Sequence, residues 1–167
     1  MSDIAIRPAT AADIPVISEL AGVIWRAHYP GLITHEQIDY MLAQRYNPIA
    51  LAEEIETVGH RLDALWMDGV IVGYANYFRY SPTEMKLDKL YLHPDLHGQG
   101  HGSRLLEHVF DESRKAGCSA LILCVNKGNE KAMKSYLRNG FSVRESICVD
   151  IGGGFVMDDF VLEKSLA

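Results

Sequence analysis

The sequence predicts a mixed α/β fold, and three observations lead to that class. Helical periodicity and strand-like apolar runs alternate along most of the chain, and glycine or proline separates nearly all of them. A length of 167 residues, with a mass of 18.6 kDa, suits one domain, 1–167. Apolar residues make up 48% and charged residues 23%, a globular balance that excludes a disordered chain.

The first elements are a short strand and a helix. Residues 4–7 alternate in polarity and end at Pro8, as a strand does. A helix follows, with Thr10 or Asp13 in position to cap it, and the turn at 29–31 ends it. Its apolar side chains recur at helical spacing: Ile14, Ile17, Leu20, Ala21 and Ile24.

A second helical region precedes three strands. Thr34 and Gln37 have the spacing of a capping box at its start. Asn47-Pro48 predicts a break, after which the helix resumes to about Val58. Asp68-Gly69 favours a tight hairpin turn. The strand-like runs are 62–67, 70–80 and 85–92.

The second half alternates helix and strand. Residues 102–116 have the pattern of an amphipathic helix that Gly117 ends. The continuous apolar run 120–125 is typical of a strand buried on both faces. A second helix is capped by Asn129 and runs to about residue 139. Two closing strands, 141–149 and 155–162, flank the glycines at 152–154.

Charge is unevenly distributed along the chain. The net charge is -6 and the isoelectric point is about 5.6, which argues against nucleic-acid binding by charge alone. Residues 1–84 contain 5 Lys and Arg against 11 Asp and Glu, whereas residues 85–167 contain 11 of each. The acidic half fits a cationic partner, or it is a solvated acidic face.

The sequence predicts a cytoplasmic protein with no membrane partner. No apolar run approaches the roughly 18 residues of a membrane span, and Met1-Ser2-Asp3 does not open a signal peptide. Three cysteines without a Cys-x-x-Cys motif indicate a reducing compartment.

The stretch between the strand 85–92 and the helix 102–116 carries the most chemical information. Gly98, Gly100 and Gly102 stand at alternate positions, so the backbone can approach a ligand and its N–H groups can converge. The following helix N-terminus adds partial positive charge. This pattern predicts a phosphate or pyrophosphate site, with an ordinary turn as the alternative.

Two common nucleotide-binding motifs are absent. The chain has no Walker sequence G-x-x-x-x-G-K-[ST]. A dinucleotide fingerprint fails because Ser103 occupies its last glycine position, and no acidic residue closes the next strand at Val125-Asn126.

Two blocks resemble the GNAT superfamily of acyl-CoA-dependent N-acyltransferases. His97-Gly98-Gln99-Gly100-His101-Gly102 is similar to its pyrophosphate loop, and Asn129-x-x-Ala132-x-x-x-Tyr136-x-x-x-Gly140-Phe141 is similar to its second coenzyme A block. The resemblance implies a GNAT-type fold. That fold has a central mixed, mostly antiparallel sheet of six to seven strands, splayed between the fourth and fifth, with helices on both faces.

The resemblance also implies acetyl-CoA as cosubstrate and direct transfer of the acetyl group to a primary amine. It gives Tyr136 the role of donating a proton to sulfur, although the residues alone allow a core aromatic there. The coenzyme-binding residues that it implies are Leu90, Tyr91, Leu92, His97, Gly98, Gln99, Gly100, His101, Gly102, Ser103, Asn129, Ala132 and Tyr136.

Histidine at position 97 departs from the family pattern, which has Arg or Gln there. A neutral or partly charged histidine donates fewer hydrogen bonds to phosphate, so we expect the backbone amides of 98–102 to carry most of the binding. His93, His97 and His101 are four residues apart, but Pro94 and the glycines exclude a helix. We therefore expect no metal site.

The identity of the general base is open. Some family members place a glutamate at the position matched to Lys86, and a charged lysine cannot accept a proton. Asp88 lies two residues on, on the same face of a regular strand, and is the candidate base. Glu84 and a water chain are the alternatives.

The acceptor is expected to be a small cationic amine such as a polyamine. Trp25, His28, Tyr29 and Tyr80 are candidates to line its pocket, or they are packing residues. Trp25-x-x-His28-Tyr29 also resembles the polyamine-type bacterial members. The alternative functions for the chain are a protein or peptide N-acetyltransferase and a non-catalytic acyl-CoA-binding sensor. The closing strands and their glycine hairpin offer an edge for a homodimer.

Overall fold

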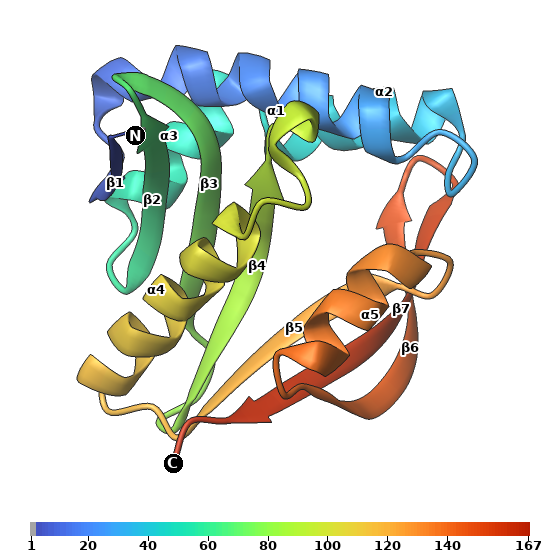
Figure 1. The fold of residues 1–167 in the computed structure, drawn as a ribbon. Helices are drawn as coiled ribbons and strands as arrows, with labels where there is room; N and C mark the ends of the chain where they lie inside the picture. The colour runs from blue at the N-terminus through green and yellow to red at the C-terminus, as the bar shows by residue number, and fades with distance from the viewer. Residues whose placement is uncertain (1–2) are drawn as a thin grey trace.

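The structure is a computed structural model that describes residues 3–167. In this range one seven-stranded sheet has the order β1-β2-β3-β4-β5-β7-β6 (Figure 1). All neighbouring strands are antiparallel except β4 and β5. The strands are β1 (Ile4–Pro8), β2 (His60–Met67), β3 (Val70–Arg79), β4 (Glu84–Leu92), β5 (Ala120–Asn126), β6 (Ser142–Gly152) and β7 (Phe155–Ser165).

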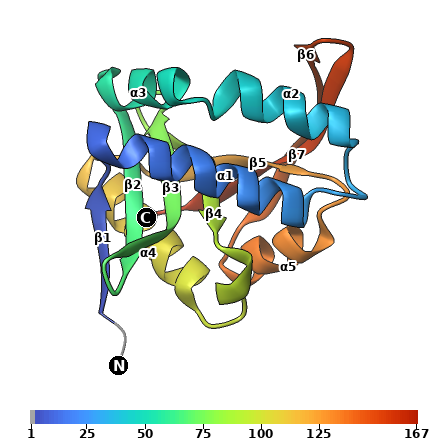
Figure 2. The same cartoon turned by 90° about the horizontal axis from the view of Figure 1, so that it is seen from above.

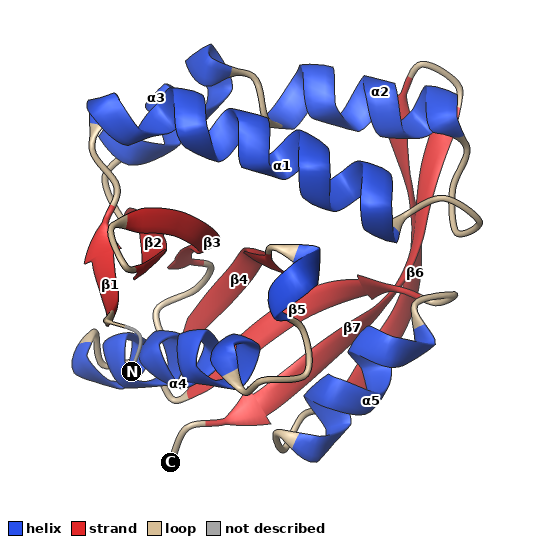
Figure 3. Cartoon of the chain, turned by 45° about the horizontal axis from the view of Figure 1, so that its top comes forward, coloured by secondary structure: helices blue, strands red, loops and turns tan. Residues whose placement is uncertain are grey.

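Helices cover both faces of the sheet, as Figure 3 shows: α1, α2 and α3 lie over one face, and α4 and α5 over the other. Each layer has its own hydrophobic core, centred on residues such as Trp25 and Tyr74 under α1 and on Phe110 and Leu123 under α4. The helices are α1 (Ile14–His28), α2 (His35–Arg45), α3 (Pro48–Glu56), α4 (His101–Lys115) and α5 (Glu130–Arg138), with short 3-10 turns η1 (Ala11–Asp13) and η2 (Pro94–Leu96).

The predicted elements are all present, with ends that differ by a few residues, and the expected fold class is confirmed. Thr10 precedes η1 and Asp13 precedes α1, and the Asp13 carboxylate accepts hydrogen bonds from the Thr10 backbone N–H at 2.8 Å and the Thr10 hydroxyl at 3.1 Å. The capping box of α2 is only half formed. Thr34 Oγ1 accepts from the Gln37 backbone N–H at 3.1 Å, but the Gln37 side-chain amide donates to the Val156 carbonyl at 2.9 Å. The glutamine therefore ties α2 to β7.

The sheet opens between β4 and β5. These strands pair only where Glu84–Leu87 runs beside residues 120–123, and beyond that point they diverge as the two arms of a V (Figure 1). Unpaired strand ends leave a gap inside the sheet that other elements must line. This opening positions the site.

A β-bulge interrupts β4 at its centre. Lys89 lies opposite Asn76 of β3 and Leu87 opposite Tyr77, so Asp88 is the extra residue. As a result Asp88 and Lys89 both contact the helical layer of α2 and α3 instead of pointing to opposite faces. The expectation of a regular strand here is wrong, because a bulge depends on pairing with β3 that the strand's own sequence does not specify.

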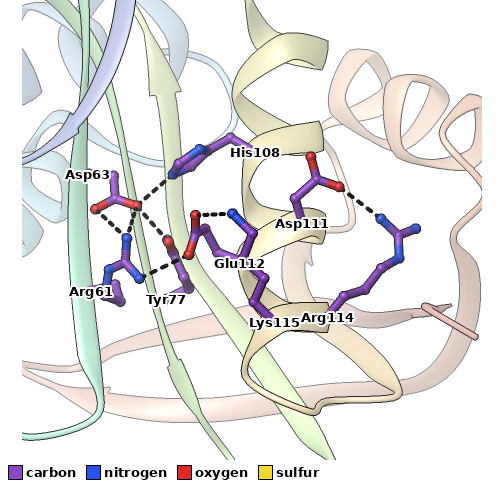
Figure 4. Close-up of polar contacts among 8 residues, drawn as sticks. All are labelled: Arg61, Asp63, Tyr77, His108, Asp111, Glu112, Arg114 and Lys115. Atoms are coloured by element: carbon purple, nitrogen blue, oxygen red, sulfur yellow. Dashed lines mark hydrogen bonds and ion pairs between the residues drawn. The ribbon is translucent and has the colours of Figure 1, made fainter.

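A buried polar cluster fastens α4 to the sheet, as Figure 4 shows. Asp63 of β2 accepts hydrogen bonds from the Tyr77 hydroxyl at 2.5 Å and from His108 Nε2 at 2.8 Å, and it pairs with Arg61 at 3.1 Å. Burial raises the pKa of Asp63, but the hydrogen bonds from His108 and Tyr77 outweigh it and lower that pKa. The cluster lies away from the opening of the sheet and stabilises the packing of α4.

Candidate active site

A cavity of about 750 Å³ occupies the opening between β4 and β5. The glycine loop and α5 close one side of it, and the last turns of α1 and α2 close the other. Strands β6 and β7 contribute the remaining wall. Its size suits a small ligand or one arm of a larger one.

The loop before α4 has the geometry of an anion cradle. Gly98 and Gly100 have φ of 80° and 84°, in the left-handed region that favours glycine, and Gly100 is the N-cap of α4. A Cβ at either position would meet nothing within 4 Å, so the backbone faces open space. Gly102 and Ser103 also line the cavity, whereas the predicted Gln99 and His101 do not. The loop thus has backbone open to the cavity at the start of a helix, the arrangement that an anion site needs.

His97 is anchored to the strand that precedes it. Its Nε2 donates to the Leu92 carbonyl at 3.0 Å, and its Nδ1 accepts from Lys131 Nζ at 3.4 Å. Lys131 belongs to the first turn of α5 and lines the cavity beside the loop. Sequence reasoning missed this lysine, because it is 34 positions away and outside the recognised motif letters.

The start of α5 is joined to the end of α1, which crosses over the sheet to reach it (Figure 2). Asn129 caps α5, with Oδ1 accepting from the Ala132 N–H at 3.2 Å, and its Nδ2 donates to His28 Nε2 at 3.0 Å. Burial, with the nearby charges of His97 and Lys131, lowers the pKa of His28. His28 is therefore neutral at pH 7, and its hydrogen bond with Asn129 links the end of α1 to the start of α5.

Tyr136 lines the cavity from α5, next to Ala132. Its ring packs edge-on against Phe141, with ring centroids 5.4 Å apart. Burial raises the pKa of Tyr136 to about 12. The phenol therefore keeps its proton at neutral pH and can donate it. The cavity also takes in Leu90, Tyr91 and Leu92, the stretch of β4 beyond its pairing with β5.

Asp88 lines the cavity but is poorly suited to accept a proton. Arg45 Nη2 lies 2.7 Å from both of its oxygens, and Lys89 Nζ lies 2.8 Å from Oδ2. Burial raises the pKa of Asp88, but Lys89 and Arg45 outweigh burial and hold it at about 2. This geometry argues against the expected role as general base. The alternative, Glu84, pairs with Arg144 at 2.6 Å and lies outside the cavity.

Aromatic side chains of the α1 layer form the wall opposite α5. Trp25 stacks on Tyr29 with centroids 4.2 Å apart, and the hydroxyls of Tyr29 and Tyr91 are 3.0 Å apart. Tyr80 is not part of this wall. It is 58% exposed at the end of β3, beside Lys86, so its expected place in an acceptor pocket is wrong.

The sequence analysis also missed Asp159 of β7, which lines the cavity and is 5% exposed. The signal that could have found it is the acidic pair Asp158-Asp159 within a closing strand, but which of the two faces inward depends on register.

No helix in residues 3–167 is long and apolar enough to cross a membrane. Within the same residues, no group of three or more His, Cys, Asp or Glu side chains is arranged to hold a metal ion.

A sheet splayed between parallel strands, with a glycine loop at the opening and a protonated phenol in the same cavity, is consistent with a coenzyme A-dependent acyltransferase. The Acetyltransferase (GNAT) family matches residues 23–141, most of the chain. The chain belongs to this family and is an acyl-CoA-dependent N-acetyltransferase that uses acetyl-CoA as cosubstrate.

Three matches to known proteins illustrate the similarity. A spermidine N(1)-acetyltransferase of Thermoplasma acidophilum is 27% identical over 165 residues, covering 96% of both chains. The fold is similar to that of PaiA N-acetyltransferase from Thermoplasma acidophilum in complex with coenzyme A, with a TM-score of 0.85, 24% identity and coverage of 98% and 99%. It is also similar to YncA from Salmonella typhimurium with acetyl-CoA, with a TM-score of 0.68, 22% identity and coverage of 98% and 94%.

Proposed function

We propose that this enzyme transfers the acetyl group of acetyl-CoA to a primary amine of a small cationic molecule, such as a polyamine, by direct attack in a ternary complex. One observation carries the proposal: a single cavity joins the pyrophosphate loop, the phenol of Tyr136 and the aromatic wall of Trp25 and Tyr29. Coenzyme and acceptor can therefore meet inside the open sheet.

The reaction makes two demands on the site. A primary amine with a pKa near ~10 arrives protonated, and it must lose a proton before its nitrogen can attack the thioester carbonyl carbon. When the carbon–sulfur bond breaks, the thiolate needs a proton. Tyr136 meets the second demand, since its pKa of about 12 keeps it protonated.

Direct attack is favoured over an acyl-enzyme because the cysteine in the cavity is a poor nucleophile. Cys124 lines the cavity from β5, and burial raises the pKa of its thiol. The thiolate is the nucleophilic form of cysteine, so a raised pKa works against its acetylation. No hydrogen bond in residues 3–167 links a histidine to Cys124 that would offset this effect.

The expected acceptor chemistry follows from the wall opposite the coenzyme. Trp25, Tyr29 and Tyr91 line the cavity there, and electron-rich aromatic rings attract alkylammonium groups. The acidic residues of the first half of the chain add to the attraction for a polycation. The relative named for spermidine acetylation supports the same acceptor class.

The first experiment tests the coenzyme and then the acceptor. Saturating acetyl-CoA should raise the melting temperature by roughly 5–10 °C, while ATP and NAD should not. Thiol release is then measured with spermidine, with a peptide that has a free N-terminus, and with a neutral amine. Preference for spermidine that weakens with added salt is expected. Preference for the peptide would identify the protein-acetylating alternative, and binding without thiol release from any amine would identify a sensor.

A further inference from the structure

Asp159 is a buried carboxylate that its own protein leaves partly unsatisfied. It is 5% exposed, and its Oδ1 has no hydrogen-bond partner in the described residues. In the sheet it lies between Asn126 of β5 and Ile147 of β6, and all three line the cavity. The side chain of Asp159 therefore belongs to the wall of the candidate active site, although Oδ1 itself is closed off from solvent.

None of the three cations near Asp159 forms an ion pair with it in residues 3–167. Arg45 pairs with Asp88 at 2.7 Å, and Lys127 pairs with Asp158, also at 2.7 Å. Lys86 lies beside the ring of Tyr80, 5.6 Å from its centroid, and makes no ion pair in residues 3–167 with Asp159. Two carboxylates thus face the cavity, and only Asp88 is neutralised by the protein.

Burying an unpaired carboxylate is costly, because the charge loses water without gaining a partner. A cationic ligand that pairs with such a carboxylate removes this cost, so a buried unpaired carboxylate in a ligand cavity favours the binding of a cation. Asp159 also holds a proton more firmly than Asp88. Burial and then Asp158 raise the pKa of Asp159, although Lys127, Lys86 and Arg45 act in the opposite direction. The pKa of Asp88 is about 2.

We propose that Asp159 is the carboxylate that binds the ammonium group of the acceptor and takes its first proton. The inference rests on the proposed function and names the base that Asp88 does not supply. The ammonium nitrogen loses two protons overall. One passes to Asp159 and then to solvent. Tyr136 gives its proton to the departing sulfur and regains one from nitrogen as the new carbon–nitrogen bond becomes an amide.

The test compares Asp159→Asn with Asp158→Asn, a matched control that changes the adjacent, exposed carboxylate. We expect Asp159→Asn to lower kcat/KM for spermidine by about 100-fold or more, and Asp158→Asn to leave it within about twofold. Both variants should keep the stabilisation by acetyl-CoA. Asp159→Asn should melt at the same temperature as the wild type or higher, because an unpaired buried charge is removed.

Two further readouts separate proton transfer from a structural role. The acidic limb of the wild-type pH profile of kcat/KM for spermidine should be altered in Asp159→Asn. An arylamine, whose nitrogen is unprotonated at neutral pH, should lose far less activity than spermidine in this variant. Equal losses on both amines with an unchanged pH profile would overturn the proposal, as would a lowered melting temperature with unaltered selectivity.

The outcomes also distinguish the inference from the function on which it rests. If the wild type acetylates spermidine and Asp159→Asn matches it, the role of Asp159 is refuted and the proposed function stands. If the wild type acetylates no cationic amine but acetylates others, both are refuted.

Discussion

His97 and Lys131 act as a pair at the coenzyme loop: the histidine side chain is bound to the Leu92 carbonyl, and the lysine ammonium lies 3.4 Å from its free nitrogen. The family pattern has Arg or Gln where His97 stands. Here the histidine fixes the loop against β4, and the positive charge beside the loop comes from α5. The loop motif thus lacks the Arg or Gln side chain of the family pattern, and Lys131 of α5 places a cation beside the loop.

Lys131→Ala should weaken acetyl-CoA binding without slowing the chemical step. Removing a cation next to the phosphates should raise KM for acetyl-CoA by roughly 3- to 10-fold, since tenfold corresponds to about 1.4 kcal/mol. Steady-state kinetics at two salt concentrations measure the change, and the difference from wild type should shrink at high salt. Lys134→Ala, one turn along α5 and outside the cavity, is the control. A similar KM change in both variants would contradict a specific role for Lys131.

Tyr136→Phe should lower kcat and leave coenzyme binding intact. The hydroxyl group is the only part removed, and loss of a general acid costs typically 100-fold or more. Thiol release measures kcat, and thermal stabilisation by acetyl-CoA measures binding. Because the pKa of Tyr136 is about 12, deprotonation of the phenol should not reduce wild-type kcat up to about pH 10. Tyr80→Phe, outside the cavity, should match the wild type in both measurements.

The Asp88–Arg45–Lys89 cluster should make stability sensitive to acid. The pKa of Asp88 is lowered from 3.8 to about 2, so its stabilisation is present above pH ~4 and is lost as the pH falls toward 2. A shift of this size contributes about 2 kcal/mol to the free energy of unfolding. By urea unfolding, Asp88→Asn should have a free energy of unfolding lower than the wild type by about this amount at pH 7. When the pH is lowered to 3, the variant should lose less of its free energy of unfolding than the wild type does.

Asp39→Asn is the control for that prediction. Asp39 pairs with Arg26 at 2.8 Å, but both side chains are more than half exposed. Surface pairs contribute about 0–1 kcal/mol, so this variant should differ little from wild type at either pH. An equal acid response in the two variants would show that the burial of the Asp88 cluster is unimportant.

Gly100→Ala should disturb the coenzyme loop through its backbone. Gly100 has φ of 84°, a conformation that costs an L-residue roughly 1–2 kcal/mol. Urea unfolding should show a loss of about that size, and KM for acetyl-CoA should rise. Gly22→Ala in α1 is the control, because a Cβ added at this position would meet nothing within 4 Å and alanine favours a helix. It should be at least as stable as the wild type.

Local patterns in the sequence predict the elements of the fold and the positions of the two motif segments. Apolar periodicity, caps such as Asn129 and glycines such as Gly100 act over a few residues, so their effects can be read locally. The two coenzyme blocks are likewise contiguous in the chain, and the loop, α5 and the opening of the sheet lie where they predict.

The surroundings of Asp88, Asp159 and Lys131 depend on the tertiary structure. The bulge that turns Asp88 toward Arg45 depends on pairing with β3, and the inward position of Asp159 depends on the register of β7 between β5 and β6. The same holds for Lys131, which reaches His97 because α5 packs beside the loop. Strand register and helix packing are set by many distant contacts at once, so a side chain's neighbours across the sheet cannot be read from the residues that adjoin it in the chain.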